Sequence, residues 1–220
     1  MLLLALAILP VIVLATYIYV KDRFQREPLY LLLLALLCGA FTTLPIILVE
    51  GWLSSLNPYD GAGGALYTAF VVAGCTEEGF KLLALYMLIW RNRHFDEYFD
   101  GIVYAAFVSL GFAGVENIMY VFGSGVGTGI MRALLSVPAH FLFAVVMGYF
   151  FALAKFYRNR SWNMLMAFLV PTLLHGTFDA LLMVAEVSEA MQSVCLVCFI
   201  IFDILLWKIG KKRMRQLEGY

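Results

Sequence analysis

The sequence predicts an all-α polytopic integral membrane protein of about seven transmembrane helices, with the N-terminus outside and the C-terminus inside. Of its 220 residues, 63% are hydrophobic and only 14% are charged, and the apolar residues form long stretches. A helix that crosses about 30 Å of hydrocarbon needs about 20 apolar residues. Seven such helices with short connections use the whole length, so we expect a single membrane-embedded domain over residues 1–220.

The first three predicted helices are apolar stretches separated by polar or Gly-rich segments. Leu2–Val20 ends before Lys21 and has no small-residue cleavage pattern after it, so we expect a retained helix rather than a signal peptide. Leu29–Val49 lies between a basic loop and an outer loop. Ala65–Trp90 follows the Gly-rich run 61–64, which we expect to be a flexible outer turn.

The last four predicted helices follow the same rule. Gly101–Phe122 and Ile130–Ala154 are separated by the Gly-rich segment 123–129, which is a second expected outer turn. Trp162–Val184 follows a basic loop, and Met191–Ile209 ends at a basic C-terminal run. Each of the four stretches has about the length that a membrane crossing requires.

The distribution of Lys and Arg predicts the orientation, because cytoplasmic loops are enriched in them. The loops 50–64, 123–129 and 185–192 contain neither residue type, whereas all but two of the 15 basic residues lie on the other side. The two exceptions are Lys81 and Arg132, both within predicted helices. We expect Arg132 to reach the outer interface, with pairing to Glu116 as the alternative. The basic residues of the inner side are Lys21, Arg23, Arg26, Arg91, Arg93, Lys155, Arg158, Arg160, Lys208, Lys211, Lys212, Arg213 and Arg215.

Five acids are predicted to lie at membrane depth: Glu77, Glu78, Glu116, Asp179 and Asp203. An ionised group at the centre of a membrane helix costs about 2.5 to 3.5 kcal/mol. The first four acids would together cost roughly 10 kcal/mol, which is comparable with the whole stability of a typical domain. Such a cost requires compensation and indicates function. Asp203 stands alone on the seventh helix, where we expect a structural polar contact or a protonated acid.

Five polar groups on four helices share one depth, roughly 5 to 12 residues inward from the outer loops. Side chains that point to a common interior are not exposed to lipid, so we expect a polar cavity among the third, fourth, fifth and sixth helices, over approximately residues 65–184. Separations above about 10 Å, or side chains that face lipid, would contradict this hypothesis. The five groups are Glu77, Glu116, His140, His175 and Asp179.

The spacing within the third helix places a lysine beside two glutamates. Glu77 and Lys81 are four residues apart, and Glu78 and Lys81 are three apart, so Lys81 can neutralise either carboxylate from one turn away. Two adjacent carboxylates in a low dielectric are not both ionised without cations. The carboxylate that Lys81 does not neutralise is therefore a candidate general base or acid.

The histidines suggest a metal site. His175 and Asp179 are four residues apart, so the carboxylate can either join the imidazole in binding a metal or orient its ring. Pro138 weakens the helix just before His140 and makes room for water or substrate. Either histidine alone would more simply be a hydrogen-bonded core residue, but two histidines with carboxylates from separate helices form a candidate Zn²⁺ site. A supporting polar stripe on the fourth helix comprises Glu116, Asn117 and Tyr120.

Other intramembrane hydrolase signatures are absent from the sequence. It contains no HExxH and no GxSG, and the nearest approach to GxGD is the segment 176–179, where Phe178 replaces the required Gly. The ordered motifs that the sequence does contain are Glu77-Glu78-x-x-Lys81, Phe99-Asp100-Gly101-Ile102-Val103-Tyr104 with Gly111-Phe112-Ala113, Glu116-Asn117-x-x-Tyr120, His140, and His175-Gly176-x-x-Asp179.

This set resembles the PrsW family of bacterial intramembrane proteases from about Ala65 to Val184, with length and topology matching across the chain. The family is more distantly similar to the CAAX-processing and bacteriocin-processing membrane proteases. The resemblance implies that Glu77 and Glu78 activate water while His140 and His175 bind metal or stabilise the oxyanion. Asp179 stands where those relatives usually have Asn, so the resemblance does not assign it a role.

By the same resemblance, the substrate is a single-pass membrane anti-sigma factor, cut on its extracytoplasmic side as the first step of regulated proteolysis. The implied location is the bacterial cytoplasmic membrane, among lipids and with no nucleic-acid partner. Two alternatives remain at this stage. Intramembrane Glu, His and Lys also build proton relays, so a proton-coupled transporter is possible. A receptor or scaffold would keep the fold without needing Glu77 or Glu78.

Overall fold

The computed structural model describes residues 2–22 and 25–217, so Arg23, one of the expected inner-side basic residues, lies outside the described residues. Within the described ranges the elements are all helical. They are α1 Leu2–Lys21, α2 Leu29–Ser55, α3 Gly61–Tyr67, the π-helical η1 Thr68–Cys75, α4 Thr76–Ile89, α5 Tyr98–Met131, the π-helical η2 Arg132–Ser136, α6 Val137–Phe156, α7 Arg160–Val187 and α8 Glu189–Leu217.

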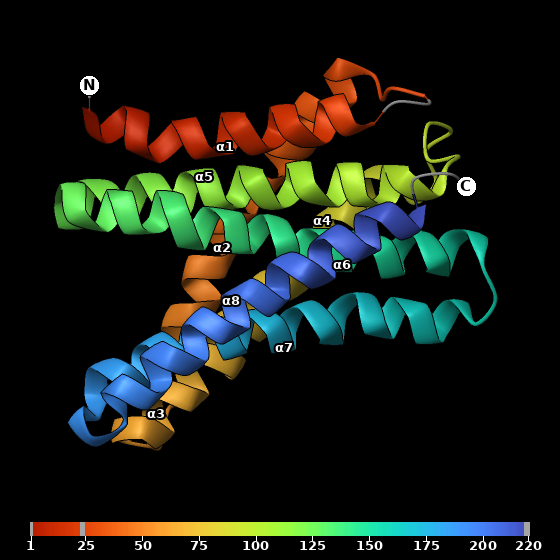
Figure 1. Ribbon diagram of the computed structural model, residues 1–220. Helices are drawn as coiled ribbons and strands as arrows, with labels where there is room; N and C mark the ends of the chain where they lie inside the picture. Colours follow the sequence, from red (N-terminus) through yellow and green to blue (C-terminus); the bar gives the residue numbers. More distant parts are fainter. Residues whose placement is uncertain (1, 23–24, 218–220) are drawn as a thin grey trace.

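Helix α5 lies at the centre of the bundle (Figure 1), where it packs against α1, α2 and α6. Helix α7 packs on the far side of α6, and it also contacts η1 and α8. The start of α1 and the end of α8 lie at opposite ends of the bundle, and the loop between α6 and α7 lies at the same end as the end of α8 (Figure 1).

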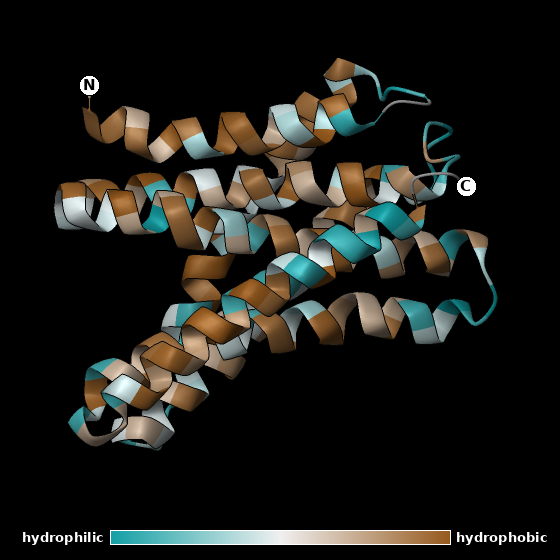
Figure 2. Ribbon diagram, viewed as in Figure 1, coloured by the Kyte–Doolittle hydropathy of each residue, from teal (hydrophilic) through white to brown (hydrophobic). Residues whose placement is uncertain are grey.

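The described helices support a multi-pass membrane protein. Five helical stretches among the described residues are long and apolar enough to cross a membrane, and brown, hydrophobic residues dominate α1 and α2 in Figure 2. The predicted fourth and fifth helices lie together in one of these stretches, Tyr98–Phe156, which is 59 residues long. The predicted third helix is divided among α3, η1 and α4. The count of seven crossings and the orientation therefore stay predictions.

The outer turn expected at 61–64 is wrong in its local structure, because that segment is helical, whereas the one expected at 123–129 contains a break between two helical stretches. Gly61 begins α3, and the segment 123–129 belongs to α5. The chain breaks its helical course at Gly125, where φ is 86° and ψ is −166°. Only glycine adopts such a φ at little cost, so the helix can be interrupted at one residue while its neighbours remain helical. Helix α2 also extends to Ser55, beyond the predicted end at Val49.

Two glycines bring α2 and α5 into close contact. A Cβ atom added to Gly39 would overlap the backbone carbonyl of Val108, and one added to Gly111 would overlap that of Leu36. Small residues at helix crossings let membrane helices approach closely and gain van der Waals contact. This crossing fixes α5, which carries Glu116, against α2.

Helix α1 is attached to α5 by one buried amide. Pro10 has no backbone N–H, so the carbonyl of Leu6 loses its partner within the helix. The Nδ2 atom of Asn117 donates hydrogen bonds to the carbonyls of Leu6 at 3.3 Å and Ala7 at 3.0 Å. Asn117 is fully buried, so it supplies the donor that the proline removes.

Candidate active site

Two π-helical segments precede the residues that the sequence singles out. Segment η1 ends at Cys75, directly before Glu77 and Glu78, and η2 ends at Ser136, directly before the turn that carries His140. A π-helix holds an extra residue in its turn, and such turns are frequent at functional sites. The two segments thus set the direction in which the carboxylates and His140 project.

Lys81 lies at the centre of the site. Its Nζ atom is 3.0 Å from Glu77 Oε2, 2.9 Å from Glu78 Oε1 and 3.2 Å from His140 Nδ1. The side chains of all four residues are buried, and Lys81 and Glu78 have no exposed surface. The prediction that Lys81 neutralises one glutamate is therefore too narrow, because the ammonium group bonds both.

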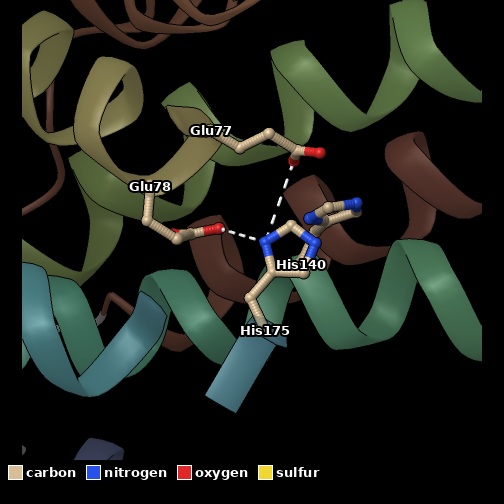
Figure 3. A group of neighbouring side chains, drawn as sticks. All are labelled: Glu77, Glu78, His140 and His175. Carbon is tan, nitrogen blue, oxygen red and sulfur yellow. Dashed lines mark hydrogen bonds and ion pairs between the residues drawn. The ribbon is translucent and has the colours of Figure 1, made fainter. Parts of the chain in front are cut away.

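His175 approaches the two glutamates from α7 (Figure 3). Its Nδ1 atom is 3.0 Å from Glu78 Oε1 and 3.8 Å from Glu77 Oε2. Its Nε2 atom lies 3.3 Å from Asp179 Oδ2, one helical turn away. The ring of Phe143 stacks on the imidazole, with centroids 5.1 Å apart. Both ring nitrogens thus face carboxylate oxygens, and the ring orientation is fixed.

The second histidine is held from the opposite side. His140 Nε2 is 3.0 Å from Glu116 Oε2, and that carboxylate pairs with Arg132 Nη2 at 2.5 Å. Arg132 Nε also donates to Asn117 Oδ1 at 3.2 Å. The alternative expectation, pairing of Arg132 with Glu116, is therefore confirmed, and Asn117 holds the same guanidinium group. Tyr120 is half-exposed, and its ring lies under the Arg132 guanidinium.

A cavity of about 750 Å³ opens beside this cluster. Glu77, His140 and His175 line it, whereas Glu78 and Lys81 lie behind its wall. The cavity was predicted among the third, fourth, fifth and sixth helices, but α2 also lines it through Glu50. Glu50 was expected to lie in a loop because the apolar stretch ends there, but α2 continues to Ser55.

The structure brings the predicted residues together within hydrogen-bonding distances, well inside the separation at which the hypothesis would have failed. Tyr120 lies at the edge of the cavity. Asp203, on α8, does not line the cavity and is partly buried. The residues in the connected network are Glu77, Glu78, Lys81, Glu116, Asn117, Arg132, His140, His175 and Asp179.

The donor atoms of the site suit a zinc ion. Glu77, Glu78, His140 and His175 each offer one ligand atom, and these atoms all lie within 4.8 Å of one another. Carboxylate oxygens and imidazole nitrogens are typical zinc ligands. The buried Oε2 atom of Glu78 has no hydrogen-bond partner among the described residues. Asp179 is not in this donor group and contacts the ring of His175 instead.

Comparison with known proteins identifies the family. The sequence profile described as PrsW family intramembrane metalloprotease matches residues 27–206. The chain is 41% identical over 222 residues to Protease PrsW of Clostridioides difficile (strain 630), an alignment that covers 98% of this chain and 90% of the relative. Protease PrsW of Geobacillus kaustophilus (strain HTA426) is 36% identical over 219 residues, with 99% and 93% covered.

Protease PrsW of Bacillus subtilis (strain 168) is 34% identical over 215 residues, with 96% of this chain and 94% of the relative covered. No solved structure matches the chain. The family favours a protease over the transporter and scaffold alternatives, and its description agrees with the metal-binding character of the donor cluster. The chain belongs to the PrsW family of intramembrane metalloproteases, and it is a membrane-embedded protease.

Proposed function

We propose that this protease cuts a single-pass membrane anti-sigma factor on its extracytoplasmic side, as the first step of regulated proteolysis in a bacterial cytoplasmic membrane. The observation that carries the assignment of the site is the convergence of Glu77, Glu78, His140 and His175 on one buried cluster beside a cavity. The bacterial relatives support the location, and the substrate rests on the resemblance of the motifs alone.

Glu77 is the proposed general base. Its carboxylate is part of the cavity wall, so a water molecule in the cavity can reach it. Glu78 is fully buried and bonds both Lys81 and His175, which suits an orienting role better than contact with substrate. Asp179 holds the other nitrogen of His175. The two adjacent glutamates thus take different roles because only one faces the cavity.

The proposed reaction is hydrolysis of a peptide bond. Glu77 takes a proton from water while the water oxygen attacks the carbonyl carbon. The negative charge that develops on the carbonyl oxygen lies beside the imidazole rings of His140 and His175, which both line the cavity, and their side of the cavity stabilises it electrostatically. Glu77 then passes the proton to the amide nitrogen as the C–N bond breaks. The products are a carboxylic acid and an amine.

The residues that would hold a Zn²⁺ ion are Glu77, Glu78, His140 and His175, and such an ion supplies Lewis-acid activation of water. The second ring nitrogens of the histidines already bond Glu116 and Asp179. Carboxylates in this position orient histidine ligands and make them more basic. The network is thus suited to binding a metal as well as to proton transfer.

The position of the cavity supports an extracytoplasmic cut. Glu50 and Ser54 line it near the end of α2, and Glu186 lines it next to the end of α7 at Val187. The charge pattern of the loops predicts that these helix ends lie outside. A substrate segment in the cavity would therefore be reached near the outer surface of the membrane.

The test is coexpression with a tagged single-pass anti-sigma factor. Cleavage is followed on immunoblots for wild type and for Glu77→Gln, Glu78→Gln, His140→Ala and His175→Ala, with the membrane level of each variant measured. We expect all four variants to lose cleavage while they accumulate normally. Removing a general acid-base group typically costs about 10²- to 10⁴-fold in rate.

Two matched controls test whether the effect belongs to the cluster. His94→Ala removes the third histidine, which lies between α4 and α5, and Asp203→Asn removes a carboxylate on α8 outside the cavity. Both controls should cut as wild type does. Wild-type cleavage by the four cluster variants would show that these residues are not catalytic. Failure of wild type to cut any anti-sigma factor would refute the substrate proposal alone.

A further inference from the structure

A lysine ammonium group stands among the atoms that would hold a metal. Lys81 Nζ lies at hydrogen-bonding distance from Glu77 Oε2, Glu78 Oε1 and His140 Nδ1, at 3.0, 2.9 and 3.2 Å. These residues supply three of the four candidate metal ligands, and the fourth, His175, bonds the same Glu78 oxygen at 3.0 Å. The positive charge is therefore already in contact with most of the donor set.

The ammonium group and a metal ion need the same lone pairs. A lysine can only donate hydrogen bonds, so the oxygens and the nitrogen that it contacts use a lone pair to accept its protons. A zinc ligand must direct a lone pair at the metal from about 2.0 to 2.2 Å. A dication and the ammonium group at neighbouring positions would also repel each other strongly in a buried site.

We propose that the Lys81 ammonium group and a divalent metal ion are alternative occupants of the same place, so that Lys81 sets the metal affinity of the site. The inference rests on the proposed function, because it concerns the cluster assigned there to catalysis. It goes further in stating that the metal binds only when the ammonium group leaves Glu77, Glu78 and His140.

The ammonium group also makes a contact that involves none of the metal donors. Lys81 Nζ lies 4.2 Å from the centroid of the Phe112 ring, and Phe112 lines the cavity. A cation over an aromatic face is stabilised by the ring quadrupole, more so when it is desolvated. The attraction to Phe112 therefore does not compete with metal binding to Glu77, Glu78 and His140.

The proposal predicts a gain of metal affinity when the charge is removed. Lys81→Met keeps an unbranched apolar chain and lacks the ammonium group, so Glu77, Glu78 and His140 are left without their competitor. We expect the dissociation constant for Co²⁺ to fall by about tenfold or more, because one positive charge next to the dication is gone. Lys208→Met removes an exposed lysine on α8 and should bind Co²⁺ as wild type does.

The experiment uses the full chain purified in detergent micelles and titrated with Co²⁺ alone, in the absence of substrate. Visible absorption of Co²⁺ reports binding to nitrogen and oxygen ligands, and the melting temperature reports whether each variant is folded. A metal that binds the folded state stabilises it in proportion to the logarithm of its concentration over the dissociation constant. Co²⁺ should therefore raise the melting temperature of Lys81→Met more than that of wild type.

A second pair of variants keeps the test decisive if Lys81→Met does not fold, because that variant leaves two buried carboxylates without a cation. Glu77→Gln and the double variant Glu77→Gln/Lys81→Met each keep Glu78, His140 and His175 as donors. The double variant removes one carboxylate and one ammonium group, so the net charge of the cluster is the same as in wild type. We expect it to bind Co²⁺ about tenfold more tightly than Glu77→Gln, for the same electrostatic reason.

Three results decide the matter. Tighter binding in both lysine variants that disappears on adding His175→Ala supports the proposal. Equal or weaker binding than in the matched backgrounds overturns it, since Lys81 then does not compete. A Co²⁺ signal that survives His175→Ala comes from another site and also overturns it. Binding is measured without cleavage, so either negative result leaves the proposed peptidase function standing.

Discussion

Arg132→Met tests the ion pair that positions His140. Arg132 and Glu116 are both 14% exposed and lie 2.5 Å apart, and Glu116 also contacts His140. Removing one partner of a buried pair typically costs about 3 to 5 kcal/mol, because a charge is left uncompensated. Partial exposure and the remaining bond to His140 reduce that cost, so we expect about 2 to 3 kcal/mol. At this chain length the loss corresponds to a fall of roughly 4 to 12 °C in melting temperature.

A double-mutant cycle separates the pair from the loss of arginine packing. Thermal unfolding in detergent is measured for Arg132→Met, Glu116→Gln and the double variant. The double variant should recover most of the loss, because its buried carboxylate is neutralised together with the arginine. A coupling free energy below about 0.5 kcal/mol would refute the reasoning, since distant independent sites reach that value. Such a result would mean that Arg132 does not stabilise the ionised carboxylate of Glu116.

Three further predictions concern residues outside the catalytic cluster. Asn117→Ala removes the donor to the two carbonyls of α1, so we expect a loss of about 1 to 3 kcal/mol in thermal unfolding; a wild-type melting temperature would contradict this. Gly111→Ala places a Cβ atom on the carbonyl of Leu36 and should destabilise the fold by about 1 to 3 kcal/mol or more. The control Gly123→Ala places its Cβ atom in open space and should leave the melting temperature unchanged. Equal melting temperatures for the two variants would exclude the close crossing of α2 and α5. Burial raises the pKa of Glu27 to about 7, so the folded state favours the protonated acid, and stability present at low pH is lost as the pH rises through about 7. Glu27→Gln should remove on the order of 2 to 3 kcal/mol of this pH dependence, measured as melting temperature from pH 5 to 9, and an unchanged slope would contradict the assignment.

The membrane class and the residues of the site could be predicted because both depend on hydropathy, helical spacing and the cost of burying charge, which can be read from a single sequence. Long apolar stretches can hardly be anything other than membrane helices. Counting inward from the loops placed Glu77, Glu116, His140 and His175 at one depth, and the cost of burying charge required them to face one another. The structure places these side chains in one connected network.

Other contacts depend on the three-dimensional arrangement of several helices. The pairing of Arg132 with Glu116 was only one of two expectations, and it forms because the chain breaks at Gly125 and returns η2 beside α5. The simultaneous bonds of Lys81 to two glutamates and His140 depend on how α4 and α6 pack, which helical spacing does not determine. Glu50 was not predicted to line the cavity, because the apolar stretch ends at Val49 while α2 continues to Ser55, so the residue was assigned to a loop.

The number of residues in the π-helical segment η1 sets the direction in which the two glutamate side chains project. Each residue added to or removed from a helix turns everything after it by about 100°, and η1 holds the extra residue directly before Glu77 and Glu78. The face that α3 presents to α7 and the face that α4 presents to the cavity are therefore set independently. A relative that lacked one residue within Thr68–Cys75 would have the same catalytic residue types, but its two glutamates would point in a different direction around the helix axis.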